Sequence, residues 1–514
     1  MKRGLLTRSL VLLHLFAMIA FGQASAQEER VVPIASGDGV IEETITADAP
    51  NRTQNPNTVY ELERDGYYTV KVPIANSGFH LKIRAAAGTG KRPIIRPFAG
   101  TSRCFMPAGD LTLEEVYINA VDAAGTLKQN SIRTAAPNIR ITITGCQLDR
   151  DLQSVMRVES AWTKWFVTRS VISNLGLMAD NNGRAWDDRG QNVDTLIIED
   201  NILYNTTGRM TRDGGGVLNY YRFNHNTVVN IFDDPLAMGE VKEAHVTNNL
   251  FINTSFMGTD TTTTWGSQVT MLRLRADTTG GTPQIVRIHH NNFHMTPGML
   301  AGYAGMFGPS GALRPAGVFD SLSSYFMRVN GDSALNMNLA ITLQNGPLDE
   351  VGPMQDYWNN SVPVGSKRNL YAGPDSGRGS WDSTQVPWDF RYSTSHPLYS
   401  AGSDGLPIGA LYIYGLVVAV EEPDGIPLTF GLSPNYPNPF NPTTTIEFTL
   451  TRRSEVSLNV YSLLGEEVAT LANGSREAGV HRVTFNAANL PSGMYFCRMA
   501  AGATSQVQKM LLLK

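Results

Sequence analysis

Three stretches with one shared pattern decide the fold of this chain: Ile198-Glu199-Asp200-Asn201-Ile202-Leu203, Phe223-Asn224-His225-Asn226-Thr227-Val228 and Val246-Thr247-Asn248-Asn249-Leu250-Phe251. Each has an apolar residue, two polar residues, an asparagine and a mostly apolar pair. A second asparagine follows four residues later, at Asn205, Asn230 and Asn253. The first asparagines are 25 and then 23 residues apart. A fixed period of this size predicts a solenoid, because a βαβ unit needs about 30 residues or more.

The asparagine position can be followed in both directions, and its column is Val116, Cys146, Ser170, Asn201, Asn226, Asn249 and Asn291. The final interval of 42 residues leaves room for one further coil or for a long insertion. A second set of short strands lies between these positions, at 103–106, 131–133, 155–158, 184–187, 235–238 and 271–275. We expect their apolar residues to face the core while arginine and aspartate alternate outward. The strands from Val59 to Ile95 are expected to form the first coil and to cover the lower edge.

Hydrogen bonding explains why asparagine occupies this position. Each coil of a parallel β-helix lies about 4.8 Å above the previous one, so an inward asparagine at a bend can bond the amides above and below it. A continuous stack satisfies every member, whereas one unsatisfied buried amide would cost about 1–3 kcal/mol. Asparagine also favours turns for local reasons. Turns alone would not place two asparagines four residues apart on three successive coils.

The composition and the N-terminus indicate an exported protein. The chain has 514 residues, a net charge of −4 and 17% charged residues, so nothing suggests a nucleic-acid partner. Residues 1–26 have a basic start, an apolar run from Leu10 to Phe21 and the small-residue stretch Ala24-Ser25-Ala26, which together predict a cleaved signal peptide. The apolar run is too short to span a bilayer as a helix. We therefore expect no transmembrane segment in the mature protein.

The sequence changes character after Glu421. A short linker is followed by the proline-rich stretch Asn435–Pro442, which disfavours a helix. Alternating apolar residues then predict short strands at 446–450, 456–460 and 483–485, with turn residues between them. Short strands at this spacing predict a small β-sandwich.

Four motifs in this part of the chain resemble the C-terminal sorting domain of the bacterial type IX secretion system, in its immunoglobulin-like form. They are Tyr436–Pro442, Val460–Gly465, Leu490–Tyr495 and Lys509–Lys514. The resemblance implies that the secretion machinery is a partner of this domain. It also implies a secreted or outer-membrane-surface location after the signal peptide is removed. In the family the sorting domain is often cleaved, and the passenger is released or attached to the cell.

Residues 59–300 resemble the right-handed parallel β-helix proteins of the pectate-lyase-like superfamily, which includes pectate lyases, polygalacturonases and alginate lyases. The chain has Asp-Asp at 187–188 and 233–234, but it lacks the other polygalacturonase motifs and the Trp-Ile-Asp-His signature of pectate lyases. The resemblance therefore implies the fold and a polysaccharide partner, and no catalytic residue is transferred from a characterised family.

The predicted fold class is all-β, a right-handed parallel β-helix solenoid followed by a small C-terminal β-sandwich. The expected organisation is a signal peptide at 1–26, the β-helix with capping segments at 27–420, a linker at 421–433 and the sorting domain at 434–514. Within the second of these, the segment Asp389–Gly409 is expected to close the solenoid by packing on its last coil.

The richest polar stretch, Asp180–Gly190, suggests where chemistry could occur, because stacking brings residues about 25 apart in sequence close together. A lyase acting on a uronic acid must neutralise the sugar carboxylate and remove a proton from the adjacent carbon. The candidate catalytic residues are Asp187, Asp188, Arg157 and Arg189. The candidate substrate-binding residues are Arg133, Arg184, Trp186 and Arg209. No cofactor is certain; Ca²⁺ is a candidate, with Asp213, Asp233 and Asp234 as ligands.

Alternatives stay open for this cluster. Two of the aspartates could form an acid–base pair for hydrolysis. All of the residues could also be structural, since aspartate and glycine favour turns and exposed ion pairs contribute little energy. The first functional hypothesis is an exported protein that binds or cleaves an acidic polysaccharide, in the manner of a lyase. The alternative is a non-catalytic adhesive or structural surface protein.

Overall fold

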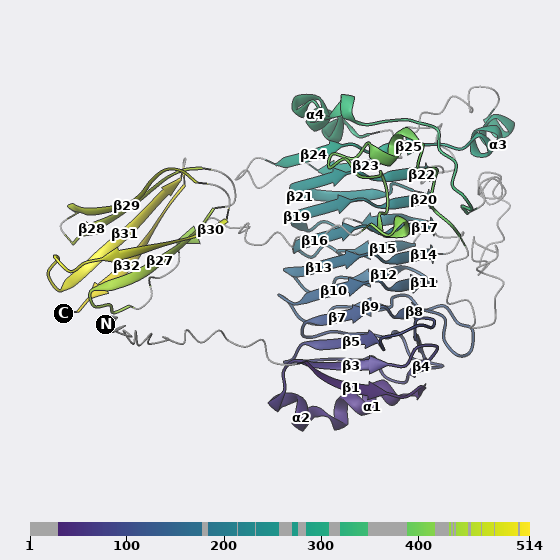
Figure 1. Cartoon of the computed structure of the whole chain (residues 1–514), viewed down its shortest axis with the longest axis horizontal. Coiled ribbons are helices and arrows are strands. Elements are labelled where there is room, and N and C mark those ends of the chain that lie inside the picture. The colour runs from purple at the N-terminus through teal and green to yellow at the C-terminus, as the bar shows by residue number, and fades with distance from the viewer. Residues whose placement is uncertain are drawn as a thin grey trace, which may run out of the picture.

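The computed structural model describes residues 29–176, 183–212, 214–231, 233–255, 270–275, 284–307, 319–347, 388–416, 431–432, 435 and 438–513, except 451–453, 464, 477–478 and 502–503. The described part is nearly all β. Residues 30–294 form a parallel β-helix, which confirms the predicted solenoid (Figure 1). The expected signal peptide and the linker at 421–433 lie wholly or mostly outside the described residues, so the domain boundaries stay predictions.

The solenoid has three faces of parallel strands. The first face contains β1 (Arg30–Ile34), β3 (Thr58–Leu62), β5 (Leu81–Ala85), β7 (Leu111–Glu114), β10 (Arg140–Thr144), β13 (Thr163–Thr168), β16 (Val193–Glu199), β19 (Val217–Asn224), the second half of β21 (Leu236–Thr247) and β24 (Ile285–His289). The second face contains β2 (Gly37–Asp38), β4 (Tyr67–Val70), β6 (Ile94–Pro97), β8 (Tyr117–Asn119), β11 (Gln147–Asp149), β14 (Val171–Leu175), β17 (Ile202–Thr206), β20 (Thr227–Ile231), β22 (Leu250–Thr254) and β25 (Asn292–His294).

The third face is shorter and contains the stretch in which the site residues were predicted. Its strands are β9 (Ile132–Arg133), β12 (Ser154–Arg157), β15 (Arg184–Asp187), β18 (Arg209–Arg212), the first half of β21 and β23 (Leu272–Arg275). Strand β18 follows the same pattern as its neighbours and was missed in the sequence. Because β21 runs without a break from the third face to the first, these two faces belong to one 15-stranded sheet.

The asparagine ladder is present at the bend between the first and second faces. The side-chain Nδ2 of Asn201 donates to Oδ1 of Asn226 at 3.1 Å, and the same bond joins Asn226 to Asn249 at 3.1 Å and Asn249 to Asn291 at 2.9 Å. Each Oδ1 also accepts the backbone N–H of the residue one coil below. Asn249 and Asn291 are neighbouring rungs, so the interval of 42 residues contains an insertion and no extra coil. The ladder continues to Asn336, which the sequence analysis did not identify.

The asparagines four residues later form a second ladder. Asn205 donates to Asn174 at 3.3 Å, Asn230 donates to Asn205 at 3.1 Å and Asn253 donates to Asn230 at 3.4 Å. Asn174 in turn donates to Asp149 at 2.9 Å. All four asparagines have a φ between 50° and 57°, and asparagine tolerates this left-handed conformation better than most residues.

The residue before each rung of the first ladder is also left-handed. These residues are Glu115, Gly145, Arg169, Asp200, His225, Asn248 and His290, with φ between 49° and 64°. The chain therefore turns sharply from the first face to the second by the same backbone conformation in every coil. The side chains at this position form a column beside the ladder.

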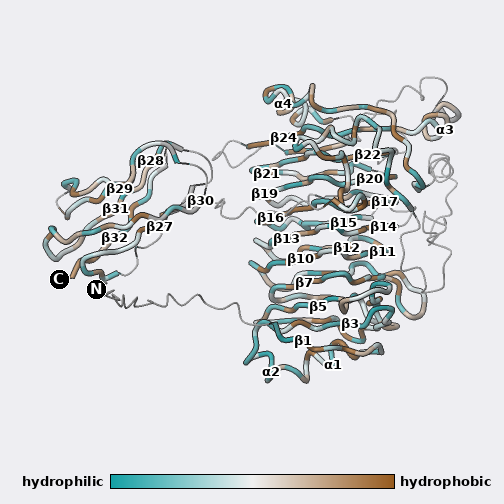
Figure 2. The backbone as a smooth tube through the Cα atoms, in the orientation of Figure 1, coloured by the Kyte–Doolittle hydropathy of each residue, from teal (hydrophilic) through white to brown (hydrophobic). Residues whose placement is uncertain are grey.

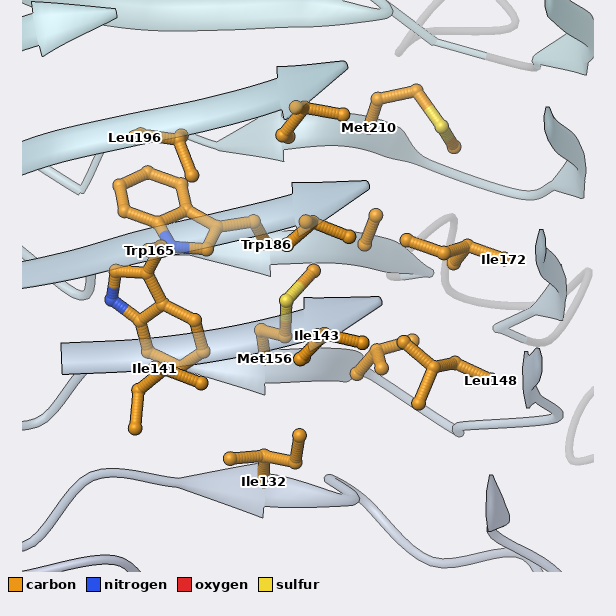
Figure 3. Packing of buried hydrophobic residues seen from close by; sticks show 14 of the residues in the cluster. Ile132, Ile141, Ile143, Leu148, Met156, Trp165, Ile172, Trp186, Leu196 and Met210 are labelled. Carbon is orange, nitrogen blue, oxygen red and sulfur yellow. The ribbon is translucent and has the colours of Figure 1, made fainter. Parts of the chain in front are cut away.

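A continuous apolar core fills the solenoid. Hydrophobic and hydrophilic residues alternate along its strands (Figure 2), and the inward residues form one buried cluster from Ile34 to Phe293. Figure 3 shows its middle, where Trp165 and Trp186 lie close together among aliphatic side chains and Met156. Both tryptophans are almost fully buried.

The lower end is capped by a helix, which corrects the expectation that the strand at Val59 opens the solenoid. Strands β1 and β2 precede that strand, and α1 (Val40–Ala47) and α2 (Ala49–Gln54) follow them. Ile41 and Ile45 are one helical turn apart on α1 and are buried in the core. The helix thus covers an end that would otherwise expose apolar residues. At the other end α4 (Ser321–Asn330) and the 3₁₀ helix η2 (Asp332–Leu335) pack against β24, while α3 (Pro297–Phe307) follows β25 (Figure 1).

Residues 388–416, which we call the strap, lie along the second face instead of on the last coil as expected. They include the 3₁₀ helices η3 (Pro397–Ser400) and η4 (Tyr412–Tyr414). Phe390 and Leu398 of the strap are buried against outward apolar residues of the second face, including Tyr204 and Ile252. These residues explain the placement, because a contiguous apolar patch on a sheet is unfavourable in water.

Residues 431–512 form two antiparallel sheets. One contains β26 (Gly431–Leu432), β27 (Thr443–Leu450) and β30 (Gly479–Asn486), and the other contains β28 (Ser454–Ser462), β29 (Glu467–Arg476), β31 (Gly493–Ala501) and β32 (Thr504–Leu512). Residues of both sheets share one buried core, which includes Phe448, Phe485, Leu458 and Met499. This arrangement is the predicted β-sandwich.

Candidate functional site

Several of the predicted site residues lie on neighbouring strands of the third face. Arg133, Arg157, Asp187 and Arg212 are Cα partners in consecutive strands β9, β12, β15 and β18. The residue before each of the first three is an inward core residue, such as Met156 before Arg157. Alternation along a strand therefore places the charged side chains on the outer surface. The stacking of the coils thus brings Arg133, Arg157 and Asp187 close together in space, as predicted.

The lower part of this surface has more positive than negative charge. Arg133 and Arg157 share one carboxylate, that of Glu159, at 3.4 Å and 2.5 Å. Burial lowers the pKa of the nearby Arg103 guanidinium, and the positive charges of Arg133 and Arg157 lower it further, whereas Glu159 opposes the shift. Because each positive charge makes a neighbouring guanidinium harder to protonate, this pKa shift indicates a positive electrostatic potential around the three arginines.

Asp187 lies between two arginines. Its carboxylate is 3.1 Å from Arg184 and 3.1 Å from Arg212, and its side chain is only 1% exposed. Burial lowers the pKa of Arg184 to about 10; Asp187 opposes this shift, while Arg212, Arg209 and Arg189 add to it. A buried carboxylate in two ion pairs is well placed to hold the arginines and poorly placed to exchange a proton with a ligand.

Asp188 has a clear local role. Its Oδ1 accepts the backbone N–H of Gly190 at 2.9 Å and the backbone N–H of Gly214 in the coil above. A Cβ atom on Gly214 would lie 2.4 Å from the backbone nitrogen of Gly190, so the two turns are in close contact. Asp188 therefore joins two stacked turns, and this geometry gives no support to a catalytic role. Arg189 is exposed in the same turn.

The position of Trp186 is at odds with its prediction as a substrate-binding residue. The ring lies in the core beside Trp165 and Met156 (Figure 3) and is 2% exposed. The physical reason is the strand alternation: Trp186 pairs with the inward Met156, and Asp187 pairs with the outward Arg157. A ligand on the third face would not reach the ring.

The candidate calcium ligands are engaged by arginines. Asp233 is 2.7 Å from Arg209, and Asp234 is 3.2 Å from Arg273 and accepts the backbone N–H of Thr270 at 2.6 Å. Burial and the neighbouring Asp233 raise the pKa of Asp234. The third candidate, Asp213, lies outside the described residues. Within the described part of the chain no three acidic, histidine or cysteine side chains are grouped closely enough to hold a metal ion. The Ca²⁺ site, whose third ligand is Asp213, stays a prediction.

A groove that the sequence analysis missed lies between the strap and the second face. Its volume is about 840 Å³, and its lining includes Arg64, Lys91 and Glu115 from solenoid turns and Trp388 and Tyr412 from the strap. These two groups are roughly 300 residues apart in the chain. No periodicity in the sequence could have brought them together.

Comparison with known proteins identifies the C-terminal part of the chain. Residues 435–513 match the family described as the secretion system C-terminal sorting domain. Neither the curated proteins nor the solved structures contain a significant match to this chain. None of the helices in the described residues is long and apolar enough to cross a membrane. The match supports export by the type IX secretion system to the medium or the cell surface, and residues 435–513 are a sorting domain of that system.

Proposed function

We propose that the chain is an exported protein whose third face binds an acidic polysaccharide. The observation that carries the proposal is the ratio of charges on this face. Six arginines share four carboxylates as ion-pair partners among the described residues: Arg133 and Arg157 with Glu159, Arg184 and Arg212 with Asp187, and Arg209 and Arg273 with Asp233 and Asp234. We call these six residues the arginine face. Its excess positive charge favours an anionic ligand.

The dimensions of the arginine face suit a polymer better than a small anion. Its strands are stacked in the order β9, β12, β15, β18, β21 and β23, which makes five steps from the first to the last. At about 4.8 Å per step, Arg133 and Arg273 are separated by roughly 24 Å along the solenoid axis. Arg133 is 37% exposed and Arg273 is 45% exposed, so both ends are accessible to a ligand. A uronic-acid chain has one carboxylate per sugar and could bind several arginines at once.

The proposal concerns binding and not catalysis, because the acidic residues of this face already have ion-pair or hydrogen-bond partners within the protein. Asp187 is held by two arginines and Asp188 holds a turn, so neither is assigned a role in proton transfer. Arg157 is 15% exposed and bonded to Glu159. A guanidinium in this position can neutralise a ligand carboxylate by a bidentate hydrogen bond.

The test is a binding titration with the mature full-length protein. Polygalacturonate, alginate and a neutral dextran are compared by calorimetry at roughly 0.05 M and 0.3 M salt, between which the screening length falls strongly. The double variant Arg133→Gln/Arg157→Gln should bind an acidic polymer about tenfold more weakly or worse. Lys164→Gln, which removes a 51% exposed cation from the first face, is the matched control and should bind normally.

The outcomes separate the hypotheses. Binding of an acidic polymer that weakens with salt and in the double variant supports the proposal. Equal binding in the double variant and the control would place the ligand elsewhere. No binding of any polymer would favour the adhesive or structural role. Ultraviolet absorbance that rises with time during incubation would show that a polyuronate is also cleaved, as by a lyase.

A further inference from the structure

The groove between the strap and the second face has the features of a ligand site that is independent of the arginine face. Three aromatic residues of the strap contribute to it, namely Trp388, Phe390 and Tyr412. Phe390 is buried and packs against Tyr204 of β17 with ring centroids 5.3 Å apart, so it forms part of the floor. Trp388 and Tyr412 are half-buried. The volume of about 840 Å³ falls in the range of about 300–1,000 Å³ that is typical of small-molecule sites.

The groove is already formed in the described structure, because both of its walls are fixed. On the strap side, the backbone N–H groups of Leu411 and Tyr412 donate to Oδ1 of Asp200 at 2.5 Å and 3.0 Å. Asn345 pairs with Asp389 by two backbone hydrogen bonds. A preformed site loses little conformational entropy when a ligand binds.

The opposite wall consists of turns of the solenoid. Nε of Arg64 donates to the carbonyl of Ala86 at 2.8 Å, and Nε of Arg92 donates to the carbonyl of Gly145 at 2.7 Å. These bonds fix the two guanidinium groups against the backbone. The wall therefore presents side chains in defined positions.

The charges of the lining are close to balance, since four cations (Arg64, Lys91, Arg92 and Arg391) meet three carboxylates (Asp65, Glu115 and Asp389). On the arginine face, by contrast, six arginines meet four carboxylates. Arg391 forms a two-pronged ion pair with Asp389, at 2.9 Å and 2.6 Å, and Arg64 lies 3.8 Å from Glu115. Asp65 accepts the backbone N–H of Lys91. A polyanion would meet these three carboxylates as well as the four cations, so a single excess positive charge would attract it and the net attraction would be small. A neutral ligand with many hydroxyl groups could donate to these carboxylates and accept from the cations.

We propose that this groove binds a short neutral oligosaccharide, with Trp388 providing a surface on which a sugar ring stacks. A sugar has apolar C–H faces and polar hydroxyl edges. The groove combines aromatic rings with paired donors and acceptors in the same way. Tyr412 adds a hydroxyl group to the lining, and this group can both donate and accept a hydrogen bond. This site does not depend on the arginine face.

The test is calorimetry and tryptophan fluorescence of the intact protein with a panel of neutral hexasaccharides, namely β-glucan, xylan and mannan fragments. Trp388→Ala should weaken binding by about tenfold or more. Trp162→Ala is the matched control, because Trp162 is an exposed tryptophan on the solenoid away from the groove lining, and it should bind normally. Lys91→Trp fills the groove from the opposite wall without changing the strap. If Trp388→Ala does not fold, this second variant tests whether the oligosaccharide binds in the groove.

The expected result is binding of at least one neutral hexasaccharide that is insensitive to salt. This binding should be lost in Trp388→Ala and Lys91→Trp and retained in the arginine-face double variant. Absence of binding to the whole panel would overturn the proposal. Unchanged affinity in both groove variants would overturn it as well, as would binding confined to acidic sugars and abolished by salt. The double variant separates this result from a failure of the arginine-face proposal.

Discussion

Asp200 ties the strap to the solenoid, and its titration predicts that the attachment depends on pH. Asp200 is 1% exposed and sits at the left-handed position before Asn201. Burial raises the pKa of its carboxyl group to about 6, although the amides of Tyr412 and Leu411, and the charges of His225 and Arg169, oppose the shift. The aspartate is therefore easier to protonate when the strap is closed.

The pH dependence of strap closure follows from the difference in the pKa of Asp200 between the closed and the open strap. When the strap opens, Asp200 meets water and its pKa returns to about 3.9. A difference of about two pKa units corresponds to about 3 kcal/mol, or on the order of a hundredfold in the opening equilibrium. Because the closed form binds the proton more tightly, closure is favoured at low pH. This advantage is lost as the pH rises from about 4 through the closed-state pKa of about 6.

The variant Asp200→Asn isolates the effect. Asparagine keeps an oxygen that can accept both strap amides, tolerates the φ of 57° and has no charge to desolvate. At pH 7.5 the strap of the variant should therefore open on the order of a hundred times less often than in the wild type. Near pH 4 the two proteins should behave alike. Hydrogen exchange of peptides covering residues 398–416, compared between the two proteins at the same pH, measures this ratio.

Asp65→Asn serves as the control, because Asp65 has a φ of 59° and is exposed. It should leave strap exchange unchanged at either pH. The reasoning is refuted if Asp200→Asn and the wild type show the same ratio of exchange rates at pH 4 and at pH 7.5, or if the variant opens more often at pH 7.5.

The remaining predictions concern the ladder, the core and export. Asn226→Ala removes a rung with four side-chain hydrogen bonds and should destabilise the solenoid by about 3 kcal/mol or more; Asn219→Ala, on the half-buried outer surface, should cost less than about 1 kcal/mol in the same urea titration. Trp186→Ala should cost about 3–5 kcal/mol in thermal unfolding, because the ring is 2% exposed, whereas Trp162→Ala, at 41% exposure, should have little effect. Deleting residues 435–513 should retain the protein inside the cell; its continued appearance in the medium or on the surface would contradict the assignment of the sorting domain.

Periodicity made most of the fold predictable. The ladder favours asparagine at one position in successive coils, because a side-chain amide donates through its nitrogen and accepts through its oxygen, and so bonds the rungs above and below at once. Asn201, Asn226 and Asn249 therefore mark the coils directly in the sequence. The sorting domain was predictable for another reason, since its motifs are long and occur in a fixed order.

The site was predictable only in part. Register placed Arg133, Arg157 and Asp187 side by side, as expected from a repeat of about 25 residues. The sequence could not show that Trp186 points inward, because alternation alone does not say which of two neighbouring residues faces the core. Pairing with Met156 on the adjacent strand decides it.

The strap and the lower cap could not be placed from the repeat, because neither follows it. The helix α1 is short, and its only buried residues are Ile41 and Ile45, so its apolar pattern does not stand out from that of a strand. The position of the strap depends on contacts such as that of Tyr412 with Asp200, across more than 200 residues. Such contacts are set by the outward apolar side chains of the second face and have no local sequence signal.

Hydrogen exchange at the first ladder tests the stacked solenoid most directly. The backbone N–H groups of Asn201, Asn226 and Asn249 each donate to the side-chain oxygen of the next rung, at 2.8–3.1 Å. These three amides should stay protected for as long as those of the core strands, and Asn226→Ala should selectively release the amide of Asn201. Exchange of all three as fast as the exposed turn at 87–90 would contradict the ladder and the fold built on it.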